Sequence, residues 1–590
     1  MSNLYRHGRV LLIAGVLIVL FFTFWKLNVF PEDVNAEVII PADVLRCLQG
    51  AHNQHVAPYN CFEGLRNFWD YREIFSTDFV NTAFVRKLWM FILSVMFNLC
   101  GYSIFTISLS SAFVSIAILF LTYALGKRLY SQEVGILAGI FLSTCTTYCM
   151  TVRASYGFTI IIVTALAVYY YLYRFLENYK RLYLIIAGVL LGIGSLDAPP
   201  QFFFIIITVI LVMFFDYFKR YQNKVKGMAA ALKDLAVILF VAAGVSLILT
   251  AIFAWYYNVT IFSVYHSVFQ WAAQRLIGSA YTAATHKYVS AGFWESLVYA
   301  LMFIKNTFFG MMTQQLDDYA LQLPGVPMIN ALVSVFFVIG LITMFIKRSK
   351  PDRFMLVWVC LHLFIFMFLI KVETRYLVYF LPAICIISAY GLVWAVGKLP
   401  LGEYAHLQRQ ILYGLAILIV SVIGYREFFI VYKNNDANLR RFYNNSKIAD
   451  FISKNSAPDG CVVVLGERLF SNRASIIFSL KYKPYKVIYL EGMLYDKAHA
   501  AGTSSITLEQ IKEAMKDLET EAFKDNKKIF YVFSEHDIRY YPSSMVPSDL
   551  YSYVQMFKDI LMFMHPGAVA VKILNYSNGD PTHSIFVVGK

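Results

Sequence analysis

The stretch IFTISLSSAFVSIAILFLTYALGKR, residues 104–128, decides the fold class. Residues 104–126 carry no charged side chain, and Lys127 and Arg128 follow them directly. The hydrocarbon core of a bilayer is about 30 Å thick, and an α-helix of about 20 apolar residues crosses it. The stretch therefore predicts a membrane-spanning helix with one basic end.

Apolar segments of the same kind recur along the chain. They cover residues 10–25, 104–126, 134–151, 158–175, 182–196, 200–217, 234–256, 328–346, 354–370, 376–397 and 410–431. Together they predict an α-helical polytopic membrane protein with about eleven transmembrane helices. Two shorter apolar stretches, 87–99 and 296–312, are predicted to lie as helices in the outer membrane interface.

The composition supports the same class. Hydrophobic residues make up 59% of the chain and charged residues 15%, whereas soluble proteins are about 45–50% apolar and about 25% charged. This excludes a soluble enzyme, a disordered regulator and a fibrous repeat. The net charge of +14 comes from basic residues beside apolar spans, so we expect them to set orientation and expect no nucleic-acid partner.

The distribution of basic residues predicts how the chain is oriented. Lys and Arg concentrate in every second short loop, for example in 219–233 and 347–353. The opposite short loops carry only Arg153, Lys371 and Arg375. Because short cytoplasmic loops are enriched in Lys and Arg, the N-terminus is predicted to be cytoplasmic. We expect an integral protein of a bacterial inner membrane.

Two domains are predicted. Residues 1–433 form the transmembrane domain, which includes an outward first loop, 30–103, and an outward segment, 258–327. Residues 434–590 form an extracytoplasmic α/β domain, because strand-like runs there alternate with helical ones. The predicted strands are 461–466, 486–490, 528–533, 569–575 and 584–588, and the predicted helices are 508–523 and 549–564. The α/β domain lacks the glycine spacing of a nucleotide-binding site, so no cofactor is expected in it.

The outward first loop carries the residues most suited to chemistry. Glu32, Asp33 and Glu37 follow the first helix closely. A carboxylate held at a membrane surface can act as a general base towards an acceptor hydroxyl or amine. Two carboxylates can also hold Mg²⁺ or Mn²⁺ against a phosphate. The alternative interpretation is a solvated acidic turn.

Basic residues lie at two other outer helix ends. Arg153 stands at one, and Lys371, Arg375 and Tyr376 form a cluster at another. Guanidinium groups bind phosphate through two parallel hydrogen bonds, so these residues are candidate ligands of a lipid phosphate. Interfacial anchoring is the alternative, because Arg and Tyr are common at membrane surfaces. In the first loop, Cys47 and Cys61 are able to form a disulfide if the compartment is oxidising.

Four stretches share a pattern with a known family. They are DVLRCLQG at 43–50, LCGYS to YALGKRL between 99 and 129, Arg153 with GVLLGIG at 188–194, and RYLVYFLPA at 375–383. In this order they resemble the C-type membrane glycosyltransferases, near the aminoarabinose transferases and the protein O-mannosyltransferases. The resemblance implies that fold, and transfer of a sugar with inversion from a polyprenyl-phosphate carrier on the outer membrane face.

The resemblance also implies roles for the acidic residues. The family carries an Asp-Glu pair early in its first loop, and Glu37 stands where its catalytic Asp is expected. Val38 stands at the position of the Glu, so the pair is altered. We therefore expect Glu37 as base and Asp33 as helper, with Glu32 in reserve, and Asp33 and Glu37 as ligands of any divalent cation.

The predicted activity is that of a hexosyl- or pentosyltransferase with a lipid, glycan or protein acceptor. Membrane lipids are expected to surround the carrier. Two alternatives stay open. A non-catalytic envelope scaffold is favoured by the altered acidic pair. A flippase or transporter for lipid-linked sugars requires a polar path and inverted repeats, which the spans do not display.

Overall fold

The computed structural model describes most of the helical part of the chain and the core of its C-terminal part. The described residues are 2–24, 87–101, 103–153, 158–196, 199–256, 261, 329, 331–368, 378–399, 405–426, 445–457, 460–465, 486–490, 508–534, 557–575 and 581–589. They fall into two compact units, one within Met1–Leu27 and Asn81–Phe428 and the other within Phe429–Lys590.

The described residues of the first unit form helices and short connections, without strands. Its helices are α1 (Ser2–Phe24), α5 (Lys87–Cys100), α6 (Ile104–Leu129), α7 (Gln132–Ser143), α8 (Thr146–Arg153), α9 (Phe158–Asn178), α10 (Arg181–Gly194), α11 (Pro199–Arg220), α12 (Lys224–Tyr256), α16 (Ala331–Lys347), α17 (Lys350–Phe368), α18 (Leu381–Gly397) and α19 (Ala405–Arg426). Within the described residues, five helices are long and apolar enough to cross a membrane. A total of about eleven spans stays a prediction.

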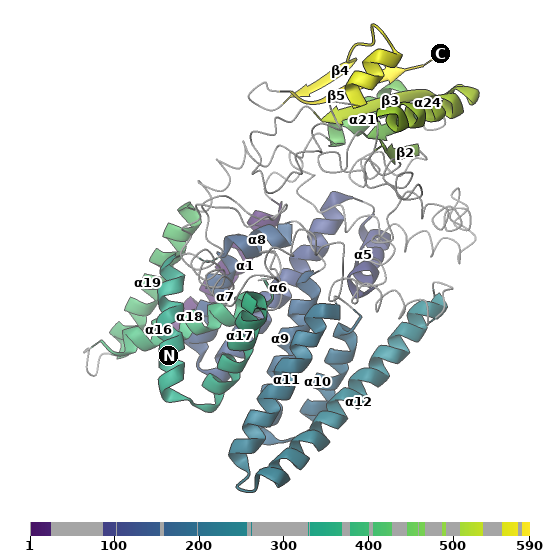
Figure 1. The fold of residues 1–590 in the computed structure, drawn as a ribbon. Coiled ribbons are helices and arrows are strands. Elements are labelled where there is room, and N and C mark those ends of the chain that lie inside the picture. Colours follow the sequence, from purple (N-terminus) through teal and green to yellow (C-terminus); the bar gives the residue numbers. More distant parts are fainter. Residues whose placement is uncertain are drawn as a thin grey trace. The chain divides into compact units, whose positions relative to one another are not determined.

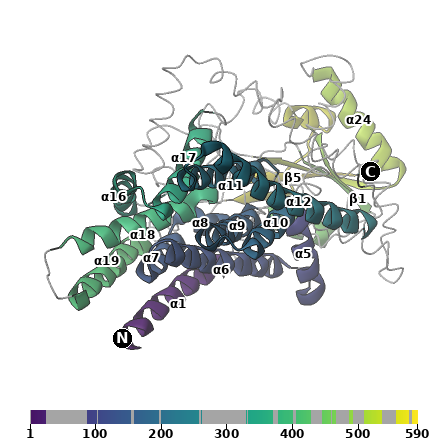
Figure 2. The same cartoon turned by 90° about the horizontal axis from the view of Figure 1, so that it is seen from below.

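Helices that are close in sequence pack side by side. α6 packs against α7 and α9, α10 packs between α9 and α12, and α11 packs against α12 and α17. Figure 1 shows α9, α10, α11 and α12 running alongside one another, and Figure 2 views the helices of this unit from below. Antiparallel packing of this kind follows from the short connections between the helices.

Glycine allows the closest helix contacts. A Cβ added at Gly391 in α18 would overlap the carbonyl oxygen of Phe336 and would lie 2.7 Å from the amide nitrogen of Gly340 in α16. At the contact between α10 and α12, a Cβ at Gly192 would lie 2.6 Å from the carbonyl oxygen of Ala242. Small residues let helix backbones approach closely, and packing in a bilayer relies on this approach.

One predicted span is divided in the structure. The segment predicted as one helix over 134–151 forms α7 and α8, with Thr144 as the C-cap of α7. The hydroxyl of Ser143 donates to the carbonyl oxygen of Ile140 at 2.8 Å, and Thr144 donates to the same oxygen at 3.1 Å. Side-chain hydroxyls that bond backbone carbonyls compete with the helical ladder, and here they stand at the residues where α7 ends.

The second unit contains a five-stranded sheet in the order β2-β1-β3-β5-β4. Its strands are β1 (Cys461–Leu465), β2 (Lys486–Tyr489), β3 (Lys528–Ser534), β4 (Lys572–Asn575) and β5 (Pro581–Val588). The three strands β2, β1 and β3 are parallel, and β5 pairs antiparallel with both β3 and β4. Each strand overlaps one of the segments predicted as strands.

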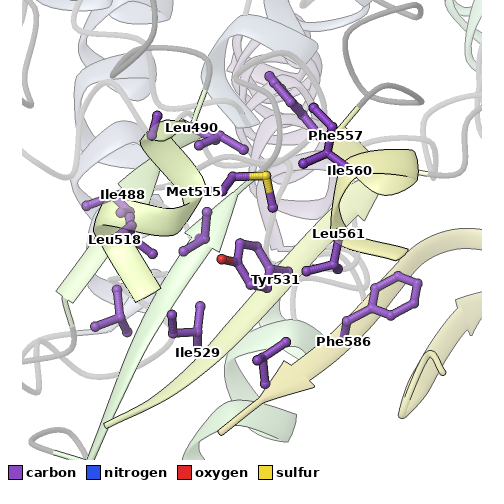
Figure 3. Packing of buried hydrophobic residues seen from close by; sticks show 14 of the residues in the cluster. Ile488, Leu490, Met515, Leu518, Ile529, Tyr531, Phe557, Ile560, Leu561 and Phe586 are labelled. Carbon is purple, nitrogen blue, oxygen red and sulfur yellow. The ribbon is translucent and has the colours of Figure 1, made fainter. Parts of the chain in front are cut away.

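Helices cover both faces of this sheet. Val462 and Val464 of β1 face a core that includes Met515 of α24 (Leu508–Lys524) and Leu561 of the helical stretch 557–564. Figure 3 shows this core, with Met515, Leu561 and Tyr531 converging above the strands. The alternate residues of β1 face α21 (Asn445–Asn455) on the other side. A strand buried on both faces reads as a continuous apolar run, as CVVVL does.

One carboxylate is buried beside the core. Oε1 of Glu519 in α24 accepts a hydrogen bond from the hydroxyl of Tyr531. The same oxygen lies 2.9 Å from Nε2 of His565. Burial and the neighbouring Glu519 raise the pKa of Tyr531 well above its usual value. The phenol therefore stays protonated and serves as the donor that a buried carboxylate requires. This contact ties α24 to β3 and to the residue after the 557–564 helix.

The contact between α16 and α18 generates a prediction. Replacing Gly391 by Ala is expected to lower the thermal unfolding midpoint of the purified protein, because overpacking a tight contact costs about 1–3 kcal/mol. Gly414→Ala in α19 is the matched control, since a Cβ there meets nothing within 4 Å. Ala is the better helix former, so the control is expected to hold or raise the midpoint. Equal effects of both changes would contradict the packing argument.

Candidate functional site

The structure describes one of the predicted site residues. Arg153 is the last residue of α8. The others lie outside the described residues: Glu32, Asp33, Glu37, Lys371, Arg375 and Tyr376. The predicted Cys47–Cys61 pair and the predicted interfacial helix 296–312 also lie outside them. The helix ends that flank these residues are described, and they define the candidate site.

The end of α1 lies beside the start of α6. The rings of Phe24, the last residue of α1, and Phe105, in the first turn of α6, have centroids 5.3 Å apart. Ser103 caps α6 by accepting a hydrogen bond from the Thr106 amide at 3.1 Å. The described part of α1 therefore ends next to the beginning of α6, eight residues before Glu32.

The short helix α8 is attached to α6 through buried polar contacts. The Ser111 hydroxyl donates to the carbonyl oxygen of Val152 at 2.7 Å, and the Tyr148 hydroxyl donates to the carbonyl oxygen of Ser115 at 2.9 Å. All four residues are buried. Val152 directly precedes Arg153, so Ser111 fixes the backbone of the residue before the candidate arginine.

A third group of helix ends surrounds a buried histidine. His362 lies nearly two turns before the end of α17, with its Nδ1 2.8 Å from the Trp358 carbonyl oxygen. Its ring centroid lies 6.0 Å from that of Phe204, near the start of α11, and 6.2 Å from that of Phe380, which caps α18. Lys371, Arg375 and Tyr376 belong to the segment between α17 and α18, whose two ends are held together here.

Two contacts join these groups of helix ends. The Lys87 amide at the start of α5 donates to the carbonyl oxygen of Leu196, just after α10, at 3.2 Å. Gly194 at the end of α10 lies directly against Thr164 in the second turn of α9, and α9 begins five residues after Arg153. The ends of α1, α8 and α17 thus lie at one end of the helical unit. The predicted acids and phosphate ligands are attached to this end.

The first turns of α6 add a feature that the sequence analysis missed. Thr106, Ser108, Ser110, Ser111 and Ser115 are all buried. Ser110 and Ser115 donate to carbonyl oxygens four residues earlier, whereas the Ser108 hydroxyl has no hydrogen-bond partner in the part of the chain that is described. The hydroxyl-rich stretch TISLSS, unusual inside an apolar span, was the available signal.

Metal binding at the site rests on residues beyond the described ranges. No three His, Cys, Asp or Glu side chains converge within the described residues. The carboxylates predicted to hold a cation, Asp33 and Glu37, lie outside them. The cation therefore belongs to the proposal developed below.

Comparison with known proteins finds a family profile that covers part of this end of the molecule. The sequence profile of a family described as dolichyl-phosphate-mannose-protein mannosyltransferase matches residues 88–243, that is 156 of the 590 residues. The match runs from α5 into α12 and includes the α6–α8 contact and Arg153. A search of curated protein sequences found no match.

Solved structures resemble the chain over most of its length. The Archaeoglobus fulgidus oligosaccharyltransferase tethered to an acceptor peptide with the NVT sequon has a TM-score of 0.52 and 13% identity, covering 98% of this chain and 74% of its own. The apo form of that enzyme has a TM-score of 0.50 and 14% identity, covering 89% and 69%.

The structure of ArnT from Cupriavidus metallidurans bound to undecaprenyl phosphate has a TM-score of 0.48 and 12% identity, covering 84% of this chain and 86% of its own. Together with the profile match, the oligosaccharyltransferase structures confirm the resemblance to the C-type membrane glycosyltransferases at the level of fold. The chain is an α-helical polytopic protein with that fold.

The contact between α6 and α8 generates a prediction. Ser111→Ala removes the bond to the Val152 carbonyl and is expected to cost about 0.5–1 kcal/mol, because hydrogen bonds between membrane helices are modest. Hydrogen exchange of the Val152 and Arg153 amides is expected to speed up. Ser110→Ala is the matched control, since its bond stays within α6. Faster exchange in α8 in both variants would show that Ser111 has no special role.

Proposed function

We propose that the protein is an inverting glycosyltransferase that moves a sugar from a polyprenyl-phosphate carrier to an acceptor on the outer membrane face. The proposal rests on two findings that concern the same part of the molecule. The mannosyltransferase profile matches the stretch from α5 into α12. Within this stretch, the start of α6 lies beside the end of α1, α8 is bonded to α6, and the start of α11 lies beside His362. The predicted acids and phosphate ligands are attached to that end.

The reaction that fits these residues is a single displacement. The acceptor oxygen or nitrogen attacks the anomeric carbon from the face opposite the phosphate. The bond from that carbon to the phosphate oxygen breaks, and the carrier phosphate leaves with the bonding electrons. Glu37 takes the acceptor's proton as general base, while Asp33 supports Glu37 and Glu32 is the substitute. The configuration at the anomeric carbon is inverted.

The phosphate is the group that the basic residues serve. Negative charge grows on it as the bond breaks, and fixed positive charges stabilise that change in a site with little water. Arg153, Lys371 and Arg375 supply those charges, and Tyr376 supplies a hydroxyl donor. The attachment of α8 to α6 through Ser111 holds the backbone at Arg153, which is the preorganisation that such stabilisation needs.

A divalent cation fits the same acidic residues. Asp33 and Glu37 offer the carboxylate oxygens that Mg²⁺ and Mn²⁺ prefer. When bound, the cation would neutralise phosphate charge as a Lewis acid. Glu37 then serves either as base or as ligand, so its role depends on whether the cation is required.

The acceptor is a lipid, a glycan or a protein, and the donor sugar is a hexose or a pentose. The profile's description names a protein mannosyltransferase, and the oligosaccharyltransferase neighbour was solved with an acceptor peptide. Both favour a protein acceptor. A bacterial inner membrane with a cytoplasmic N-terminus is the proposed location. The second candidate function is a non-catalytic scaffold, which Val38 in place of the family's Glu favours.

The role of Glu37 is testable by substitution. Glu37→Gln is expected to lower the transfer rate by about 10²–10⁴-fold, because a well-placed general base contributes that much. The measurement is transfer of radiolabelled sugar from polyprenyl-phosphate donors by the full-length protein in lipid. Glu63→Gln, which removes another acid of the same loop, is the matched control and is expected to retain activity. Full activity of Glu37→Gln together with loss in Asp33→Asn would reassign the base to Asp33.

The cation is testable by chelation. If Asp33 and Glu37 hold Mg²⁺ or Mn²⁺, EDTA is expected to abolish transfer, and either ion is expected to restore it. Binding of Mn²⁺ measured by electron paramagnetic resonance is expected to weaken in Asp33→Asn. Transfer that persists in EDTA would remove the cation from the mechanism and leave Glu37 as a base alone. Inactivity of the native chain with every donor tested would favour the scaffold.

A further inference from the structure

A cavity lies at the basic end of the helical unit, between α9, α11 and α17. Its enclosed volume is only about 20 Å³ and it opens widely at its mouth, where its walls come from the last turns of α9 and α11 and the first turns of α17. These turns adjoin the basic loops 219–233 and 347–353, which the charge pattern places in the cytoplasm. The mechanism proposed above uses none of these residues.

The walls of the cavity are mainly apolar. Val212 of α11 and Phe354 of α17 are buried in it, while Phe215 of α11 is 54% exposed and continues the cavity wall onto the outer surface of the helices. An exposed phenylalanine on a membrane helix faces lipid. The cavity therefore opens towards the bilayer as well as towards the basic loops. Apolar walls favour a lipid, which has an acyl chain to place against them, over a small soluble anion.

Two cations line the cavity from the first turn of α17. Lys350 forms an ion pair with Asp216 at 3.2 Å and also donates to the carbonyl oxygen of Leu176. Arg353 donates through Nη1 to the carbonyl oxygen of Arg348 at 2.8 Å, and it has no carboxylate partner among the described residues. The lining thus carries two positive charges and one negative charge. The first turn of α17 also contains the buried Asp352, which accepts hydrogen bonds from the amide and the hydroxyl of Ser349. Asp352 therefore offsets the partial positive charge of the helix N-terminus.

The acid in the cavity is held by its neighbours. Asp216 accepts a hydrogen bond from the Tyr179 hydroxyl at 2.5 Å in addition to its ion pair with Lys350. Burial, then Asp216 itself, raises the pKa of Tyr179 to about 12, so the phenol remains a donor. Arg220 lies 3.5 Å from the centre of the Tyr179 ring and adds a further cation at this end. Asp216 is therefore occupied, and Arg353 has capacity for an anion.

We propose that this cavity binds the phosphate headgroup of an anionic phospholipid from the leaflet at the basic end of the protein. Arg353 holds the phosphate at the mouth of the cavity, Lys350 adds charge, and the Phe215 wall receives the upper part of an acyl chain. Basic pockets between membrane helices on the cytoplasmic side suit anionic headgroups. The lipid would tie α9, α11 and α17 together at this end. The proposal is independent of the transferase activity.

The test compares lipids in nanodiscs that hold the full-length protein. Phosphatidylglycerol added to phosphatidylcholine discs is expected to raise the thermal unfolding midpoint, because a ligand that binds only the folded state stabilises it. Native mass spectrometry is expected to find phosphatidylglycerol retained on the protein. In Arg353→Gln, retention is expected to weaken by roughly tenfold, since a hydrogen bond to a charged group contributes that much. Arg353→Lys is expected to keep part of the effect.

The matched control is Arg348→Gln. Arg348 belongs to the same basic loop and is exposed, but it does not line the cavity. This variant is expected to retain the lipid and the rise in midpoint. Equal loss in Arg348→Gln and Arg353→Gln would overturn the proposal in favour of general surface charge. So would an equal rise in midpoint with inorganic phosphate in detergent, because the ligand would then be a soluble anion. Unchanged retention in Arg353→Gln would overturn it as well.

Discussion

Water is missing from the hydrocarbon core of a bilayer, and the rest of this structure follows from that constraint. Main-chain N–H and C=O groups must then bond each other, so each segment in the membrane is a helix. The hydroxyls of Ser110, Ser115 and Thr122 obey the same constraint, because each donates to a carbonyl oxygen of its own helix. Polar chemistry is left to the helix ends, where the described structure gathers α1, α8 and α17.

The helices were largely predictable because hydrophobic length is a local property of the sequence. The segment predicted at 104–126 corresponds to α6 over Ile104–Leu129, and the predicted strand 461–466 corresponds to β1 over Cys461–Leu465. The division of 134–151 was not predicted, because hydrophobicity does not register how Ser143 and Thr144 use their hydroxyls. The apolar content falls where α7 ends, because α8 begins with Thr146 and Thr147 directly after Ser143, Thr144 and Cys145.

The candidate site was predictable in part. Charge at helix ends is visible in the sequence, which is why Arg153 and the acidic loop were singled out. The partners of those helix ends were not visible, because Ser111 meets Val152 across 41 residues. At the opposite, basic end, Lys350 likewise meets Asp216 across 134 residues (350 − 216). The basic loop 347–353 was interpreted from sequence only as an orientation signal. The shape of the cavity beside it depends on three helices that no local pattern connects.

The separation of α8 from α7 has a consequence for how this protein can change during evolution. Since α8 is a helix separate from α7, its direction depends on its bonds to α6 through Ser111 and Tyr148 and on its packing against α1. Substitutions along that seam can re-aim the Arg153 backbone while the neighbouring span keeps its depth in the lipid. Under the role proposed for Arg153, such substitutions offer a way to change how the protein meets its substrate without changing its insertion into the membrane.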